Sequence, residues 1–333
     1  MDKKEWNVQL KPFARPNHKK AMIQILNTVV IYIALLIFTM YLYQADTSIL
    51  YIIPLIIVTG LFMIRVFILF HDCTHQSFTS SRKWNERLGY FFGILTFTSY
   101  AAWQKDHNIH HGAVGNLDRR GAGDIWTLTI EEYNEKPMLM KAWYRLFRHP
   151  MFLFTVAPIF LFTVLQRIPT KHARRREHLG YLITNIGILL QAGLLSYMFS
   201  ISTYLIIQLS VMFIGGTVGV WMFYVQHQFE EVYWEEASEW NSVDAALKGS
   251  TFYQLPAILE WFSGYIGYHH IHHLNSRIPN YHLKKCYYTI QELQEVKTIR
   301  FKESLKLALL QIYDQKRKRL ISFQELNLRK NYN

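Results

Sequence analysis

Cysteine is scarce in this chain of 333 residues, which contains only Cys73 and Cys286. Two cysteines cannot form a disulfide framework, and they are too few for a four-cysteine iron–sulfur or zinc site. The sequence also lacks the motif His-Glu-x-x-His, in which two histidines bind zinc and the glutamate acts as a base. These absences exclude thiolate metal centres of the usual kind and argue against a zinc hydrolase.

Acidic residues are also few, since 24 of them stand against 36 lysines and arginines, for a formal net charge of +12. Such an excess could indicate a nucleic-acid partner, but the basic residues are unevenly distributed. The segments 44–47 and 200–202 contain none of them. All but one of the basic residues lie in segments 1–21, 71–87, 104–149, 167–179 and 226–333. Because positive charge marks the cytoplasmic side of membrane proteins, we interpret this pattern as membrane topology and not as nucleic-acid binding.

Long apolar runs account for much of the chain, half of whose residues are hydrophobic. The hydrocarbon core of a bilayer is about 30 Å thick and requires about 20 apolar residues per helix. Four runs meet this requirement: Met22–Tyr43, Ser48–Phe70, Gly180–Phe199 and Thr203–Val225. They predict an all-α, polytopic membrane protein with four long transmembrane helices in two hairpins.

Two shorter apolar runs, Leu88–Trp103 and Met151–Gln166, are marginal for crossing a bilayer. For all the basic segments to share the cytoplasmic side, these runs must enter the membrane and return, or lie flat on it. We therefore expect one domain over residues 1–333, with a membrane region at 22–225 and a helical cytoplasmic cap at 226–333. Residues 1–21 are expected to form an interfacial segment, and both termini should be cytoplasmic.

Arg65 is the one basic residue inside a predicted span. Asp72 follows seven residues later, on nearly the same face of a helix with 3.6 residues per turn. The spacing predicts a structural ion pair between Arg65 and Asp72.

Histidines are grouped in three boxes at the edges of apolar segments. The boxes read His71-Asp-Cys-Thr-His75, His107-Asn-Ile-His110-His111 and His269-His-Ile-His272-His273. On a helix, histidines spaced by three and four residues lie within an arc of about 100°, so each box can direct its imidazoles into one cavity. His270 falls at the outer edge of that arc, and we expect a polar or supporting role for it. His227 follows the last apolar run directly and joins the boxes.

A single histidine pair would be interpreted most simply as an ordinary surface feature, but three boxes at one predicted membrane face favour a metal centre. Imidazole suits zinc, copper, iron and nickel. An all-nitrogen site with eight or nine ligands is too large for one ion and fits two iron ions with open positions for dioxygen. Such a pair would supply the oxidant that an unactivated C–H bond requires. The remaining histidines lack box spacing and are expected at the surface: His18, His149, His172, His178 and His282.

Four stretches of the chain resemble the membrane fatty-acid desaturase family, and in particular the Bacillus-type acyl-lipid (phospholipid) desaturases. They are Phe70–Phe78, Asn116–Trp126, Val220–His227 and Gly267–Leu274. The resemblance implies a dioxygen-dependent enzyme that introduces a cis double bond, with carbon five as one position, into acyl chains of membrane phospholipids. It implies that electrons arrive from a separate ferredoxin or flavodoxin. It also implies a non-haem centre of two iron ions with these ligands: His71, His75, His107, His110, His111, His227, His269, His272 and His273.

One position departs from part of this family. Some animal relatives have an asparagine that holds a metal-bound water four residues before the equivalent of His227, and Phe223 stands there in this chain. Two carboxylates near the boxes, Asp106 and Asp124, could orient ligand imidazoles. The alternatives are a helix cap for Asp106 and a loop turn for Asp124.

Aromatic and basic residues near the boxes suggest further roles. Trp126, Trp221 and Tyr224 could line an acyl channel, although aromatic residues at a membrane edge are more often interface anchors. The basic runs Arg174–Arg176 and Lys316–Arg319 are candidates for docking an acidic electron carrier.

Two other functions compete with desaturation. The first is a lipid hydroxylase or alkane-type monooxygenase on the same diiron core. The second is a metal transporter or membrane sensor, whose site would lie near the bilayer midplane. The four predicted spans contain no histidine, which counts against transport.

Overall fold

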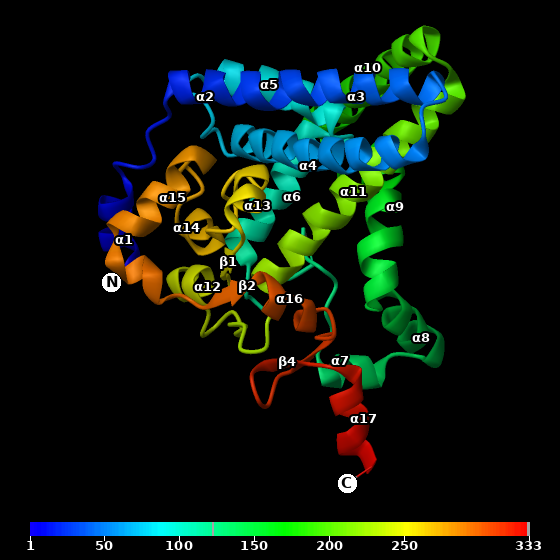
Figure 1. The fold of residues 1–333 in the computed structure, drawn as a ribbon. Helices are drawn as coiled ribbons and strands as arrows, with labels where there is room; N and C mark the ends of the chain where they lie inside the picture. The colour runs from blue at the N-terminus through cyan, green and yellow to red at the C-terminus, as the bar shows by residue number, and fades with distance from the viewer. Residues whose placement is uncertain (122, 332–333) are drawn as a thin grey trace.

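The computed structural model describes residues 1–121 and 123–331, so Ala122, in the stretch Asn116–Trp126, lies outside the described residues. Its fold is mostly helical (Figure 1). Four helices are long and apolar enough to cross a membrane: His18–Gln44, Ile49–Thr74, Arg175–Met198 and Ile201–His227. The four predicted spans are therefore confirmed, and each helix continues past its apolar run at one end or both.

The spanning helices form two hairpins. The first span comprises α2 (His18–Gln24), a π-helical segment (Ile25–Val30) and α3 (Ile31–Gln44), and it is followed by α4 (Ile49–Thr74). The second hairpin comprises α10 (Arg175–Met198) and α11 (Ile201–His227). Ser48 and Ser200 cap the returning helices, because each hydroxyl accepts a hydrogen bond from a backbone N–H of the first turn. Both hairpin turns lie at the same end of the molecule (Figure 1).

Helix α4 lies at the centre of the membrane region, where it packs against α3, α11 and α5 (Arg82–Leu95). Gly60 permits the close approach of α4 to α11, since a Cβ atom at this position would lie 2.6 Å from Ile214 Cγ2. Small residues have this role in many membrane helix pairs, where packing replaces the hydrophobic driving force.

Neither marginal apolar run forms a straight span. The first is divided between α5 and α6 (Tyr100–Ala113) by a turn at residues 96–99, where Phe97 has a φ of 56°. The second begins after α8 (Met138–Phe147) and comprises a π-helical segment (Phe152–Val156), α9 (Ala157–Thr163) and a 3-10 turn (Leu165–Arg167). This part is bent by 64° relative to α8. Pro150 lies three residues after the end of α8, and a proline disfavours helix in the residue before it.

The cap is mainly helical but also contains four short strands. The parallel pair is β1 (Phe252–Gln254) with β2 (Thr298–Arg300), and the antiparallel pair is β3 (Ile312–Asp314) with β4 (Arg319–Ile321). The helices of the cap are α12 (Ser242–Lys248), α13 (Ala257–Phe262), α14 (His269–Leu274), α15 (Asn280–Thr289), a 3-10 helix (Gln291–Glu295), α16 (Phe301–Leu307) and α17 (Phe323–Asn331). Two short helices lie outside the cap in sequence, α1 (Lys3–Leu10) and α7 (Ile130–Glu135). Strands of three residues are too short to produce a recognisable alternation, which is why the sequence did not predict them.

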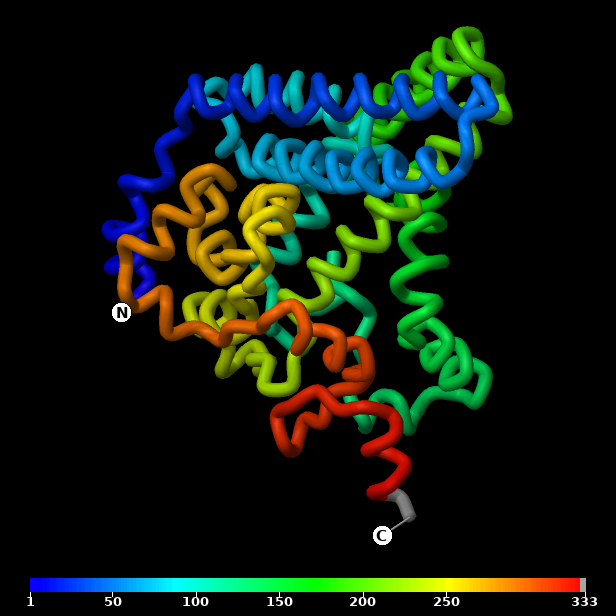
Figure 2. The backbone as a smooth tube through the Cα atoms, viewed as in Figure 1, coloured from blue at the N-terminus to red at the C-terminus, as the bar shows by residue number. Residues whose placement is uncertain are grey.

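The N-terminal segment packs on the cap, and its expected place at the membrane interface stays a prediction. Trp6 and Leu10 of α1, together with Phe13, are buried in the same hydrophobic cluster as Leu283 of α15. Trp6 and Leu10 are four residues apart and lie on one stripe of α1, and Phe13 follows in the turn after this helix. Figure 2 shows the beginning of the chain beside the segment that contains α15.

The expected ion pair between Arg65 and Asp72 is not formed. Arg65 Nε donates to Thr28 Oγ1 at 2.9 Å, Nη1 donates to the carbonyl of Trp261, and the guanidinium lies 3.9 Å from the Trp261 ring centroid. Seven residues of helix rise about 10.5 Å, which separates the two side chains along the axis. A charge within a span costs up to about 2.5–3.5 kcal/mol on insertion scales, and the contacts with Thr28 and Trp261 lower this cost without supplying a negative charge.

We predict that Gly60→Ala destabilises the protein by about 1–3 kcal/mol, because the added methyl group would overlap Ile214. Thermal unfolding in detergent measures the effect. Gly193→Ala is the matched control, since a Cβ at Gly193 in α10 meets no atom within 4 Å. The control should be neutral or stabilised by up to about 1 kcal/mol, the helix propensity difference between glycine and alanine. Equal stability of the two variants would contradict tight packing of α4 on α11.

Candidate metal centre

The histidine boxes meet where four helices end or begin. His71 lies in the last turn of α4 and His75 is its C-cap, while α6 carries box two near its end. His227 is the last residue of α11, and box three forms the short helix α14 of the cap. The ligand atoms fall into two groups, in each of which all atoms lie within 4.8 Å of one another. Cluster A contains His71, His75, His107, His111 and His272, and cluster B contains His110, His227, His269 and His273.

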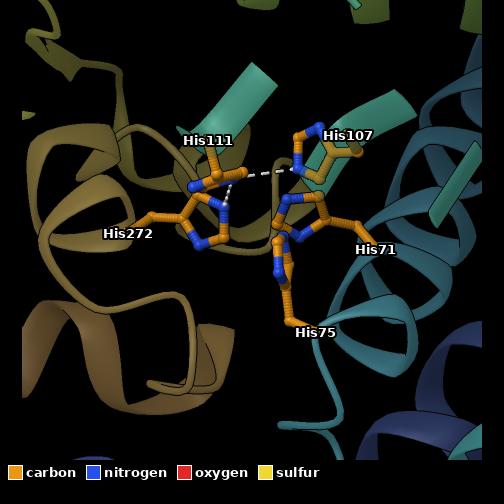
Figure 3. A group of neighbouring side chains, drawn as sticks. All are labelled: His71, His75, His107, His111 and His272. Carbon is orange, nitrogen blue, oxygen red and sulfur yellow. Dashed lines mark hydrogen bonds between the residues drawn. The ribbon is translucent and has the colours of Figure 1, made fainter. Parts of the chain in front are cut away.

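In cluster A the imidazole rings converge from α4, α6 and α14 (Figure 3). His111 Nε2 lies 3.1 Å from His107 Nε2 and 2.9 Å from His272 Nε2. The ring centroids of His71 and His272 are 4.4 Å apart, so the cap histidine closes the group formed by the membrane helices.

Cluster B lies directly beside cluster A. His269 Nε2 is 2.9 Å from His227 Nε2 and 3.1 Å from His273 Nε2. His110 completes this group, with its ring centroid 4.9 Å from that of His227. The two clusters adjoin through His111 and His273, whose rings stack with centroids 4.2 Å apart.

The donor set fits metal ions. Ring nitrogens bind a metal at about 2.0–2.1 Å, so two neighbouring ligands of one ion lie about 3 Å apart, close to the spacing in both clusters. His75 Nε2 and His110 Nε2 are buried and have no hydrogen-bond partner among the described residues. Buried polar atoms are rarely left unpaired, and a metal would satisfy these two. Neither cluster includes a carboxylate, and an all-imidazole set suits iron, copper or zinc better than magnesium or calcium.

The protonation states favour metal binding as well. Burial, reinforced by the neighbouring imidazoles, holds the pKa of each of the following side chains well below its ordinary value: His75, His107, His111, His269, His272 and His273. These rings are therefore neutral at physiological pH, and each offers the lone pair that a metal requires.

Groups around cluster B fix the orientation of its rings. His110 Nδ1 donates to Asp124 Oδ1 at 2.5 Å, and His227 Nδ1 donates to the carbonyl of Gly249 at 3.1 Å. Burial would raise the pKa of the Asp124 carboxyl, but the hydrogen bond and charge of His110, together with the Gly121 N–H and the charge of His227, outweigh burial and bring this pKa below its ordinary value. Asp124 thus orients an imidazole, as one of the two predictions for it stated. It also accepts a hydrogen bond from Gly121 N, which belongs to the loop turn that the other prediction named.

Asp106 has neither of the roles predicted for it. It lies in the middle of α6, so it does not cap this helix, and its carboxylate bonds to no histidine among the residues that the structure describes. Its position immediately before His107 turns the side chain by about 100° from that of the histidine.

Asp72 and Asn280, for which the sequence suggested no role beside the histidines, support cluster A. Asp72 lies beside His71, with 3.4 Å between Oδ1 and His71 Nδ1. Asp72 Oδ2 accepts hydrogen bonds from Asn280 N at 2.7 Å and from Asn280 Nδ2 at 2.9 Å. Gln24 Nε2 in turn donates to Asn280 Oδ1 at 2.6 Å. The only sequence signal for this chain of hydrogen bonds is the position of Asp72 within box one.

A cavity of about 410 Å³ adjoins cluster B and is lined by His227, Asp124, Phe223 and Trp126. The Phe223 ring lies 5.3 Å from that of His110 and 5.1 Å from that of His227. A phenyl ring offers no ligand atom, so this side chain cannot hold a metal-bound water as the asparagine of some animal relatives does.

The three aromatic residues near the boxes divide between two roles. Trp126 lines the cavity, whereas Trp221 Nε1 donates to Tyr253 OH at 3.1 Å and connects α11 to the cap. Tyr224 is fully buried, and its hydroxyl donates to the carbonyl of Leu310. Trp221 and Tyr224 therefore join the membrane region to the cap and are not interface anchors.

The other histidines lie outside both clusters. His270 is buried against Tyr287, with ring centroids 5.9 Å apart. His282 is partly buried, and its Nδ1 donates to the carbonyl of Phe13 at 2.9 Å. The exposed ones, as the sequence predicted, are His18, His149, His172 and His178.

The clusters also constrain the membrane topology. Residues 75 and 107 belong to one cluster, so α5 and the beginning of α6 form an excursion that returns to the same face. His110 and His227 likewise meet in cluster B, and α10 and α11 between them form a hairpin. The bent pair of α8 with residues 152–167 must therefore also return to its starting side, which leaves four spans.

The two basic runs differ in how far their charge is neutralised. Lys318 pairs with Glu235 at 2.6 Å, and Arg319 pairs with Glu230 at 2.5 Å and with Glu325 at 2.6 Å. In Arg174–Arg176, by contrast, Arg176 pairs with Glu86 at the longer distance of 3.4 Å, and Arg175 is exposed and forms no ion pair among the residues that the structure describes. The run at 174–176 is therefore the stronger candidate for an acidic partner.

Comparison with known proteins agrees with this geometry. Residues 46–302 match the family described as "Fatty acid desaturase". A protein of Bacillus subtilis (strain 168) named "Fatty acid desaturase" is 40% identical over 323 residues, which cover 97% of this chain and 91% of the relative. An "sn-1 oleoyl-lipid 12-desaturase" of Picosynechococcus is 25% identical over 72% of this chain and 69% of its own length. An "sn-1 acyl-lipid omega-3 desaturase (ferredoxin)" of Nostoc is also 25% identical, over 66% of this chain and 62% of the relative. The chain belongs to the fatty acid desaturase family.

Proposed function

We propose that this protein is a dioxygen-dependent acyl-lipid desaturase with a pair of iron ions, one held by cluster A and one by cluster B. The observation that carries the proposal is the convergence of nine imidazoles, seven of them buried and two partly buried, without a carboxylate, in a chain of this family. Bound there, the iron pair would activate dioxygen, the oxidant that an unactivated C–H bond requires. Two electrons from a carrier, with two protons and the two hydrogens removed from the chain, reduce one dioxygen to two waters.

The protein's own residues position the ligands for this reaction. Asp124 accepts the Nδ1 proton of His110 and so leaves Nε2 of that ring directed into cluster B. The Gly249 carbonyl acts on His227 in the same way. In cluster A, Asn280 holds the Asp72 carboxylate beside His71. Burial of most of these rings excludes bulk water, which protects an oxidising centre from side reactions.

The proposed substrates are acyl chains of membrane phospholipids. The printed names of the Picosynechococcus and Nostoc relatives give lipid-linked acyl chains, at position 12 and at the omega-3 position. The name of the Bacillus subtilis relative gives no position. Insertion at carbon five therefore stays a prediction from resemblance, without support from these names.

We place the enzyme in the cell membrane with both termini and the metal centre on the cytoplasmic side. The support is the absence of basic residues from the hairpin connectors 44–47 and 200–202, set against their abundance in the other polar segments. A cytoplasmic ferredoxin or flavodoxin then supplies electrons, and the name of the Nostoc relative includes ferredoxin. The exposed basic run Arg174–Arg176 is the proposed docking site.

Expression in a host that lacks the product tests the function, and gas chromatography with mass spectrometry of the host lipids measures it. The parent protein should produce new monounsaturated chains, and double-bond derivatisation then gives the position. His110→Ala should lower this product at least roughly tenfold, because cluster B loses a ligand. His178→Ala, at an exposed histidine of α10, should leave the product unchanged.

Other products would contradict the proposal in specific ways. Hydroxylated chains without double bonds would indicate the hydroxylase alternative on the same core. Two irons per purified chain, with no oxidation of any acyl lipid after addition of reductant and dioxygen, would instead favour a metal sensor or transporter.

We predict that Asp124→Asn lowers the affinity for iron roughly 10- to 100-fold, because the amide holds the His110 imidazole more weakly than the carboxylate does. Metal analysis after dialysis against a graded chelator measures the change. Asp106→Asn is the matched control on α6, since that carboxylate bonds to no histidine among the described residues. Equal iron loss in both variants would show that Asp124 does not stabilise the iron site by orienting His110.

A further inference from the structure

A second cavity, of about 440 Å³, lies where the first spanning helix meets the cap. Its lining residues come from α2, α4, α15 and the turn after α13, and they include Lys20, Gln24, Arg65, Lys284 and Lys285. We propose that this cavity binds the phosphate headgroup of an anionic membrane phospholipid, such as phosphatidylglycerol. The site is separate from the metal clusters, and the proposal does not depend on the reaction.

The charge in this cavity is mostly uncompensated. Arg65 is only 2% exposed, forms no ion pair, and its Nη2 has no hydrogen-bond partner within residues 1–121 and 123–331. Lys20 and Lys285 are exposed and likewise form no ion pair in this part of the chain. Lys284 pairs with Glu260 at 2.6 Å, and no carboxylate lines the cavity. A buried cation without a counter-ion is costly, and an anionic ligand would supply the missing charge.

The position of the cavity fits a lipid headgroup. It lies beside the start of the first span, where Met22, Ile23 and Leu26 are exposed, as expected for side chains that contact acyl chains. Its rim carries Tyr265 and Tyr288, and tyrosine is enriched at the boundary between headgroups and hydrocarbon. The start of α15 lies next to the ends of α2 and α4 (Figure 1).

The charge also selects among phospholipids. A phosphate next to Arg65, Lys20 and Lys285 gains electrostatic stabilisation, and Arg and Lys are the usual partners of phosphate oxygens. The amine of a zwitterionic headgroup would be placed in the same field and repelled. We therefore expect a headgroup that carries net negative charge. Gln24 and Tyr281 also line the cavity, so a bound lipid would hold α15 against α2.

Native mass spectrometry of the full-length protein in detergent tests the proposal. We expect the parent protein to retain one phosphatidylglycerol per chain and to release phosphatidylcholine readily. The double variant Lys20→Gln/Lys285→Gln should bind phosphatidylglycerol roughly tenfold more weakly, since two cations near the phosphate are removed. Arg65→Gln should have a similar effect, and if it does not fold, the surface pair alone carries the test.

A matched control variant removes the same charge elsewhere. Arg82→Gln/Lys83→Gln changes two exposed cations at the start of α5 and should leave lipid retention within about twofold of the parent, because these residues lie outside the cavity. Unchanged retention in Lys20→Gln/Lys285→Gln would overturn the proposal, and so would an equal loss in the control. Displacement of the lipid by an equal concentration of inorganic phosphate would identify free phosphate as the ligand and also overturn it. Lipid retention is measured without turnover, so this outcome is independent of the desaturase assay.

Discussion

Nine imidazoles that face one another in a buried space are the constraint on which the rest of the structure depends. A neutral imidazole has one donor and one acceptor nitrogen, so rings that are crowded edge to edge cannot all be paired with each other. Each buried nitrogen left unpaired costs about 1–3 kcal/mol. The surrounding structure must therefore hold the rings against this penalty. Asp124, the Gly249 carbonyl and the pair Asp72–Asn280 do so by fixing the outward-facing nitrogens of His110, His227 and His71.

The sequence predicted the parts of this arrangement that depend on local periodicity. Four apolar runs gave four spans, and histidine spacing gave the boxes. The imidazoles of each box face one buried space, but the spacing did not show that this space holds two clusters. Box two gives His107 and His111 to cluster A and His110 to cluster B, and box three is divided as well. On α6, His107 and His111 are about 40° apart, whereas His110 is turned by about 100° from His111. The adjacent residues His110 and His111 therefore belong to different clusters. The sequence gives the angle between them, but only the structure shows that two clusters lie side by side.

Contacts between distant segments were beyond prediction from spacing. Asp72 was matched with Arg65 because both lie on one helical face, yet its partner is Asn280, 208 residues away. Arg65 instead meets the cap at Trp261. Similarly, Tyr224 reaches the Leu310 carbonyl and not the membrane interface. In each case a polar group at a membrane edge finds a partner in the cap, because burial there makes an unpaired group more costly than any local preference.

The cap is therefore part of the candidate metal centre, because it supplies histidines to both clusters. Cluster A takes His272 from the cap, and cluster B takes His269 and His273, so neither can assemble unless α14 is docked on α4, α6 and α11. The same docking surface contains Arg65 with Trp261 and Asn280 with Asp72. Metal ions bound between membrane helices and cap would stabilise this interface by their binding free energy. The cap must therefore fold and dock at the ends of the membrane helices before either cluster is complete. Docking of the cap and assembly of the two clusters are thus coupled.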